Sequence, residues 1–359
     1  MTRPNDLSAT EARKLIGNKQ LSPLELTKSC IDQIERYNPS INAVVAINHE
    51  DVLKEAKKAE DDVMAGKELG LLHGLPVGIK DLNPVKDLRS TSGSKLFENR
   101  IPDYDDSVVA DIRAEGGIVF CKTNTPEFGA GANTKNKVYG ATCNPFDLTK
   151  TPAGSSGGSA AALATNMMPL ANGSDYGGSL RTPAGYCGVT GFRPSPGLVP
   201  ATEASVSLNP FSVQGPMGRN VEDMMRLLSI MSGPDKRLPL TLMERLPKYE
   251  ELKPASLNNV KIGWMGDYEG YLPTENGLLK LCEKALEDIG HTGLITEFCS
   301  PNYDMNRLWQ TWLTLRHWDC LWAKDYYEDL ETRKLLKPEL IWEVEGAYQV
   351  TADQLHQAG

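Results

Sequence analysis

The sequence lacks the features that mark membrane proteins, secreted proteins and nucleic-acid-binding proteins. Its longest stretch of small and apolar residues, 160–171, is interrupted by Asn166 and is too short to span a bilayer. The first residues, Met1–Asp6, contain no apolar segment of the kind that a secretory signal needs. No long run of lysine and arginine occurs, and 47 acidic against 38 basic residues give a net charge of −9. We therefore expect neither a membrane nor a nucleic acid as a partner.

Paired cysteine motifs are also missing. The seven cysteines lie far apart, their number is odd, and no C-x-x-C pair occurs. We therefore expect buried free thiols in the reducing cytoplasm. The triplet Asn172-Gly173-Ser174 matches a glycosylation site, which we interpret as a chance match. No G-x-x-x-x-G-K-[ST] occurs, which excludes a P-loop for the glycine-rich middle of the chain.

What the chain does contain is an ordinary globular composition with clear helix and strand signals. Its 359 residues, 40% hydrophobic and 24% charged, allow one large domain or two closely associated ones. Ser8–Glu11 and Ser22–Glu25 are capping boxes that predict two opening helices. Further helices are predicted at 51–64, 107–114, 159–167, 221–231 and 274–289, and strands at 75–79, 118–121, 169–173 and 260–264. This alternation predicts an α/β protein with a largely parallel central sheet, followed after the helix at 221–231 by a proline- and charge-rich link, 234–259.

One glycine-rich segment of the sequence suggests nucleophilic chemistry. Gly177 and Gly178 directly precede Ser179, and they allow successive N–H groups to point at one small anion. A serine nucleophile needs such donors and also a base within hydrogen-bond reach. Taken alone, this segment is better explained as a simple tight turn.

The choice of base falls on a lysine. The five histidines have no triad-like context, whereas Lys80 follows a predicted buried strand that would lower its pKa by desolvation. The neighbouring Asp81 would act in the opposite direction. A surface pair of Lys80 and Asp81 is the alternative interpretation.

The residues Lys80, Ser155 and Ser179 resemble the Lys, cis-Ser and Ser of the amidase signature family. Seventy-five residues separate the first from the second and 24 the second from the third. The resemblance is specific over residues 70–232 and faint elsewhere. It includes the segments Leu72–Asp81, Lys122–Phe128, Asn144–Asp147, Gly177–Ala184 and Cys187–Val189.

This resemblance implies a fold and a domain organisation. We expect an α/β amidase signature fold, with a central, mostly parallel mixed sheet flanked by helices. A single domain would cover residues 1–359, with an N-terminal helical part at 1–69, the signature core at 70–232 and a less recognisable part at 233–359. Because the family normally continues beyond this length, we expect the fold to be C-terminally incomplete.

The resemblance also implies an activity, the hydrolysis of a small or medium neutral carboxamide to an acid and ammonia or an amine. Neutral Lys80 would accept a proton relayed through Ser155, which follows a cis peptide bond, from the nucleophile Ser179. The oxyanion hole would consist of the N–H groups of Tyr176, Gly177, Gly178 and Ser179. No metal or organic cofactor is needed, and the oligomeric state stays open, a homodimer included.

Supporting roles follow from matching positions in the family. Ser156, Asp175 and Arg181 would brace the loops, and Asp175 would accept loop N–H groups. Two residues depart from the family pattern. Ala153 replaces a usual glycine and is tolerated if its φ is negative, and Tyr176 replaces a small or β-branched residue and would narrow or line the acyl pocket.

Three alternatives remain at this stage. Gly154–Gly158 also satisfies G-x-S-x-G, which would make Ser156 the nucleophile of an α/β-hydrolase, although residues 149–153 form a poor preceding strand. A glutaminase component of a tRNA-dependent amidotransferase typically has glutamine where this chain has Thr182, and an acidic–glutamine pair that residues 209–216 lack. The third alternative is a non-catalytic or incomplete homologue.

An aromatic cluster near the end of the chain is interpreted as packing. Trp312, Leu315, Trp322 and Tyr326 fall roughly on one helical face, which is typical of a core or interface stripe. Lining of an acyl-group funnel and an exposed aromatic patch are the alternatives.

Overall fold

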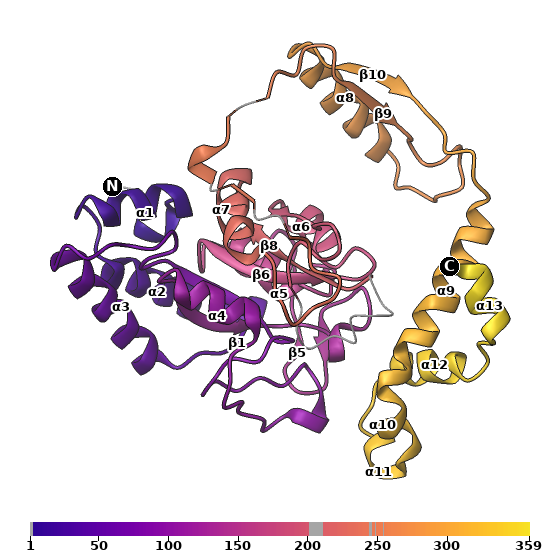
Figure 1. Ribbon diagram of the computed structural model, residues 1–359, viewed down its shortest axis with the longest axis horizontal. Coiled ribbons are helices and arrows are strands. Elements are labelled where there is room, and N and C mark those ends of the chain that lie inside the picture. The colour runs from indigo at the N-terminus through magenta and orange to yellow at the C-terminus, as the bar shows by residue number, and fades with distance from the viewer. Residues whose placement is uncertain (1–2, 201–210, 244–245, 248, 254) are drawn as a thin grey trace. The chain divides into compact units, whose positions relative to one another are not determined.

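The computed structural model describes residues 3–200, 211–243, 246–247, 249–253 and 255–359 (Figure 1). It consists of two compact units, Met1–Glu251 with Asp319–Gly346, and Leu252–Trp318 with Ala347–Gly359. The single domain over 1–359 stays a prediction. Outside the described residues lie 209 and 210 of the segment compared with the glutaminase components, and 244, 245, 248 and 254 of the predicted link.

A six-stranded mixed sheet lies in the first unit, in the order β1-β3-β2-β6-β8-β7. Parallel pairing joins β3, β2 and β6 at the centre, and β1, β8 and β7 pair antiparallel. The expected central mixed sheet is confirmed, with its parallel part confined to the middle strands. The strands are β1 (Val44–Ala46), β2 (Pro76–Lys80), β3 (Ile118–Thr123), β6 (Leu170–Asp175), β7 (Thr190–Gly191) and β8 (Val213–Gly218), and a separate pair is β4 (Lys135–Asn136) with β5 (Gly140–Ala141).

Helices flank this sheet (Figure 1). Helix α5 contacts β2, β3 and β6, α4 contacts β3, and α7 contacts β8. Both capping boxes are confirmed, with the Ser8 and Ser22 hydroxyls accepting N–H bonds at the starts of α1 and α2. The helices of this part of the chain are α1 (Ala9–Gly17), α2 (Pro23–Ile41), α3 (His49–Met64), α4 (Ser107–Ala114), α5 (Gly157–Ala164), α6 (Arg181–Cys187) and α7 (Val221–Met231).

Two elements of the sheet region have no sequence signal. Helix α6 contains Pro183 and Gly185, and strand β8 contains Gly215 and Pro216, residues that disfavour a helix interior and a strand interior respectively. Strand β8 nevertheless pairs with β6 along its whole length. Tertiary pairing therefore overrides local preference here.

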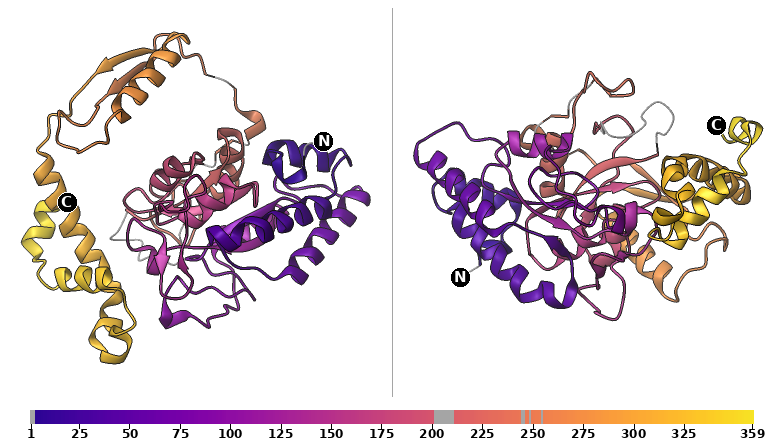
Figure 2. Two further views of the ribbon diagram at one scale, coloured as in Figure 1. Left: turned by 180° about the vertical axis from the view of Figure 1, so that it is seen from behind. Right: turned by 90° about the horizontal axis from the view of Figure 1, so that it is seen from below.

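The second unit contains a small βαβ arrangement. Strands β9 (Lys261–Trp264) and β10 (Ile295–Phe298) pair in parallel, and α8 (Leu278–Gly290), which connects them, lies along the pair (Figure 2). Both the strand at 260–264 and the helix at 274–289 were expected. The unit also contains most of α9 (Met305–Asp319) and all of α13 (Ala352–Ala358).

The prediction of one aromatic helical face is wrong. Helix α9 ends at Asp319, and a 3₁₀ turn, Cys320–Ala323, separates it from α10 (Lys324–Glu328). Trp312 and Trp322 therefore belong to different elements. Trp322 is half-exposed and packs against Phe128, whose ring centroid lies 5.0 Å away. The chain continues through α11 (Leu330–Arg333) and α12 (Pro338–Ala347).

All seven cysteines are free thiols, but they are not uniformly buried. Cys30, Cys121, Cys187 and Cys320 are buried, whereas Cys143 and Cys282 are half-buried and Cys299 is exposed. The expectation of buried thiols is wrong for these last three. Among the described residues, no helix combines the length and apolar character needed to cross a membrane.

Ala153 does not have the negative φ that we expected for an alanine at this position. Its φ is +61°, in the left-handed region, while its side chain is only 3% exposed. This conformation costs an L-amino acid about 1–2 kcal/mol, and glycine adopts it without that cost. The position therefore has a physical reason to favour glycine.

We predict that Ala153→Gly is less destabilising than Ala162→Gly by at least about 1 kcal/mol. Both changes delete a buried methyl group, but Ala162 lies inside the right-handed helix α5, where glycine costs about 1 kcal/mol. Urea unfolding of the two variants and of the wild type measures the difference. Equal losses in the two variants would contradict the strain assigned to Ala153.

Candidate active site

The centre of the site is a lysine with no exposure to solvent. Lys80 is the last residue of β2, and its Nζ donates to Ser155 Oγ at 2.6 Å and to Ser174 Oγ at 2.9 Å. Burial lowers the pKa of Lys80 to about 7, although the Asp175 carboxylate acts in the opposite direction. Near neutral pH a large fraction of Lys80 is therefore an uncharged amine.

The neighbouring Asp81 does not pair with Lys80. It accepts hydrogen bonds from the Thr91 N–H at 3.1 Å and the Thr91 hydroxyl at 2.6 Å, and Lys122 Nζ lies 3.8 Å from it. Alternation of side chains along an extended chain directs Lys80 and Asp81 to opposite sides. Because both residues are fully buried, the interpretation as a surface ion pair is wrong.

The serine loop brings Ser155 to the lysine. The Gly154–Ser155 peptide bond is cis, as the family resemblance implies. On its two sides, the Thr134 hydroxyl donates to the Ala153 carbonyl at 2.9 Å and accepts from the Gly157 N–H at 3.1 Å. Thr134 therefore fixes the backbone that carries Ser155.

Ser156 lies beside β6 and away from solvent. Its hydroxyl donates to the Ser174 carbonyl and accepts from the Ser174 N–H, both at 3.3 Å, and the residue is fully buried. Residues 149–156, all described, contain no strand. The nucleophile elbow requires a strand at this place, so the α/β-hydrolase interpretation is wrong.

The loop that carries Ser179 is joined to the serine loop through the backbone. The Ser156 N–H donates to the Ser179 carbonyl at 3.2 Å, and Ser179 itself is half-buried. Lys80, Ser155 and Ser179 therefore come from one strand end and two loops that are joined by a backbone hydrogen bond.

Asp175 organises the Ser179 loop. Its carboxylate accepts the N–H groups of Gly178 at 2.8 Å and Leu180 at 3.1 Å, and it pairs with Arg181 at 3.1 Å and Arg193 at 3.0 Å. Burial raises the pKa of Asp175, but the hydrogen bonds from Arg181, Gly178 and Leu180 outweigh this and lower it to about 2. The carboxylate is therefore ionised at neutral pH.

These contacts bear on the expected set of oxyanion donors. Gly178 has a φ of +117°, and its N–H donates to Asp175, so its role as an oxyanion donor stays a prediction. Within the described part of the chain, the N–H groups of Gly177 and Ser179 donate no hydrogen bond. The side chain of Tyr176 packs on Phe211, with ring centroids 5.7 Å apart.

Two polar residues of β6 were not assigned a role from the sequence. Asn172 is fully buried, its Oδ1 accepts from the Lys80 N–H at 2.7 Å, and its amide donates to Asn83 Oδ1 at 2.9 Å. Ser174, two residues on, accepts from Lys80 Nζ. The usable signal was the period of two in a buried strand, which puts Asn172 and Ser174 on one face.

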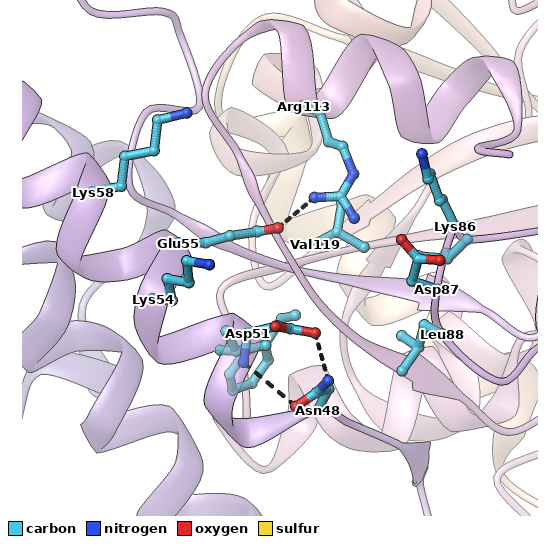
Figure 3. Close-up of a pocket in the computed structure, with 13 residues that line it drawn as sticks. Asn48, Asp51, Lys54, Glu55, Lys58, Lys86, Asp87, Leu88, Arg113 and Val119 are labelled. Atoms are coloured by element: carbon cyan, nitrogen blue, oxygen red, sulfur yellow. Dashed lines mark hydrogen bonds and ion pairs between the residues drawn. The ribbon is translucent and has the colours of Figure 1, made fainter. Parts of the chain in front are cut away.

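A charged cavity of about 310 Å³ lies elsewhere in the first unit, between α3 and residues 85–88 (Figure 3). Glu55 and Arg113 form an ion pair at 2.6 Å within it, and Lys54, Lys58 and Lys86 also line it. Neither Lys80 nor the four serines of the site, Ser155, Ser156, Ser174 and Ser179, contribute to its lining. This cavity is separate from the lysine–serine cluster.

Comparison with known proteins identifies a matching family and several relatives. The Amidase family model matches residues 25–351. An acylamidase of Rhodococcus erythropolis is 38% identical over 298 residues, which are 83% of this chain and 62% of the relative. A glutamyl-tRNA(Gln) amidotransferase subunit of Coxiella burnetii (strain RSA 493 / Nine Mile phase I) is 35% identical over 300 residues, 82% of this chain and 62% of the relative.

The fold is also similar to solved structures. A bacterial aryl acylamidase of the amidase signature family superposes with a TM-score of 0.89 at 28% identity, covering 98% of this chain and 74% of that one. The chain spans about 62% of the length of the curated relatives named above. Since the family model matches most of its residues, the chain belongs to the amidase signature family.

Proposed function

We propose that this protein hydrolyses a carboxylic amide through an acyl-enzyme on Ser179. Ser179 Oγ attacks the amide carbonyl, and its proton passes through the Ser155 hydroxyl to neutral Lys80. The oxyanion of the tetrahedral intermediate accepts hydrogen bonds from the N–H groups of Gly177 and Ser179, and the Tyr176 N–H is a further donor. Collapse expels the amine, which takes the proton back from Ser155, and water then releases the acid by the reverse relay.

One observation carries this proposal, the 2.6 Å hydrogen bond between Ser155 Oγ and a completely buried lysine. Desolvation makes Lys80 a base near pH 7, where an ordinary lysine is an ammonium. The connection between the Ser156 N–H and the Ser179 carbonyl supports a role for the next loop as the source of the nucleophile. Asp175, Arg181 and Ser156 act by holding these loops.

We propose a neutral acyl amide as the substrate class. The names of the acylamidase relative and of the aryl acylamidase structure support this choice. Tyr176, packed on Phe211 beside the donor loop, provides an aromatic surface suited to an apolar acyl group.

The second candidate is glutamine hydrolysis for an amidotransferase. The 35% identity to the Coxiella burnetii amidotransferase chain favours it. Against it stand Thr182 in place of that branch's glutamine and the missing acidic–glutamine pair in 209–216.

The proposed function predicts, first, that a fluorophosphonate probe labels Ser179 of the purified chain. Mass spectrometry of the peptides locates the adduct. Ser179→Ala abolishes the label and lowers amide turnover by at least about 10³-fold, and Lys80→Ala also abolishes the label. Ser156→Ala tests the rival nucleophile: it retains an adduct on Ser179, at a lower rate because the Ser156 hydroxyl holds its loop to β6. A label on Ser156, or full turnover by Ser179→Ala, would refute the assignment.

The second prediction concerns pH. Because only neutral Lys80 accepts a proton, kcat/KM rises about tenfold per pH unit below pH 7 and levels off above a midpoint at about 7. Ser174→Ala shifts the midpoint to lower pH, because the Ser174 oxygen accepts a hydrogen bond that favours the ammonium form.

The control for this profile is Ser159→Ala. Ser159 is also a buried serine, but its hydroxyl donates to the Asn172 carbonyl at 2.9 Å, whereas the Lys80 amine donates to Ser155 and Ser174. The midpoint of the pH profile of Ser159→Ala stays at the wild-type value. A flat profile from pH 5 to 9 in the wild type would contradict Lys80 as the base.

The third prediction separates the two candidate substrates. Ammonia release from glutamine is compared with product release from a neutral anilide at equal concentrations. We expect the anilide to be turned over with a kcat/KM at least about tenfold higher. Faster release from glutamine would favour the amidotransferase candidate.

A further inference from the structure

The segment from Glu127 to Thr134, which we call the bracket, lies along the loop that carries Ser155. A methyl group built on Gly129 would lie 3.6 Å from Ser155 Oγ, and one built on Gly154 would lie 3.2 Å from the backbone of Ala132. Thr134 ends the bracket with its hydrogen bonds to Ala153 and Gly157. The loop of the relay serine therefore lies next to the bracket and is hydrogen-bonded to its last residue.

The other end of the bracket is fastened by a residue from far along the chain. The Lys337 N–H donates to Glu127 Oε2 at 2.6 Å, and Lys337 Nζ donates to the Ala130 carbonyl at 2.5 Å. Glu127 is 3% exposed, and its second oxygen accepts from Ser94 Oγ at 2.8 Å. Lys337 therefore binds both the buried carboxylate and the backbone of the bracket.

Ring contacts of Phe128 hold the bracket in an unfavourable backbone conformation. Phe128 has a φ of +53°, which costs a bulky residue about 1–2 kcal/mol. Its ring contacts Phe97, Trp322 and Tyr326, with centroid distances of 5.8, 5.0 and 6.4 Å. Such a conformation persists where the surrounding structure over-determines it.

We propose that Lys337 is a positioning residue of the active site, which holds the bracket against Ser155 and thereby keeps the Ser155 hydroxyl on Lys80 Nζ. This inference rests on the proposed function. Loosening the bracket at Ala130 gives the Ser155 loop room to move away from the 2.6 Å contact. Displacement of a reacting group by about 1 Å lowers rates up to about 10²-fold, so the effect falls on the acylation step.

The test measures the rate of fluorophosphonate labelling of Ser179 and the hydrogen exchange of residues 127–134 and 153–157. Lys337→Met keeps most of the apolar stem and removes the bond to Ala130. We expect labelling at least about tenfold slower and faster exchange in both segments. Lys337→Arg restores a donor and recovers most of the rate.

The matched control is Lys334→Met in the same region of the chain. The side chain of Lys334 is 67% exposed and pairs with Glu331 at 2.5 Å, away from the bracket. It is expected to label and exchange as the wild type does. Equal labelling and exchange in Lys337→Met and Lys334→Met would overturn the inference.

Two further arms keep the test decisive. If Lys337→Met does not fold, Lys337→Gln replaces it, since its shorter side chain also loses the bond to the Ala130 carbonyl. Labelling slower than in Lys334→Met supports the inference, and wild-type labelling by the folded variant overturns it. If folded wild type is not labelled, the proposed function fails, and hydrogen exchange alone decides whether Lys337 holds the bracket.

Discussion

The burial of one amine is the constraint on which the site depends. A lysine with no solvent contact is destabilised as an ammonium unless a carboxylate pairs with it, and its N–H groups need acceptors. Lys80 is buried in this way because β2 is an inner strand between β3 and β6, and the hydroxyls of Ser155 and Ser174 lie where the strand ends. The sheet order buries Lys80, and the Ser155 loop and β6 provide the hydroxyl groups that accept its hydrogen bonds.

The two carboxylates nearest to the site have separate tasks. Asp81 is adjacent to Lys80 along the chain, yet it lies with Lys122 and Thr91 on the other side of β2. Asp175, almost a hundred residues away, is the charge that acts on Lys80 and also holds the loop of Ser179. Strand alternation and strand pairing, more than proximity in sequence, decide which carboxylate interacts electrostatically with the Lys80 amine.

The sequence indicates those parts of this structure that depend on local signals. The capping boxes, α4 and α7, and a buried strand ending at Lys80 follow from periodicity and helix start residues. The pairing of β8 with β6 and the hydrogen bond from the Gly178 N–H to Asp175 depend on residues distant in sequence or on loop geometry. For that reason the number of usable oxyanion donors could not be read from the glycines alone.

The connection between the two serine loops has a consequence for how they change over evolution. The Ser156 N–H and the Ser179 carbonyl are main-chain groups, so this link does not depend on the side chain at position 179. A threonine or cysteine there would alter the nucleophile while the spacing of the loops is retained. The nucleophile can therefore be exchanged by a single substitution while the hydrogen bond that joins the two loops is kept.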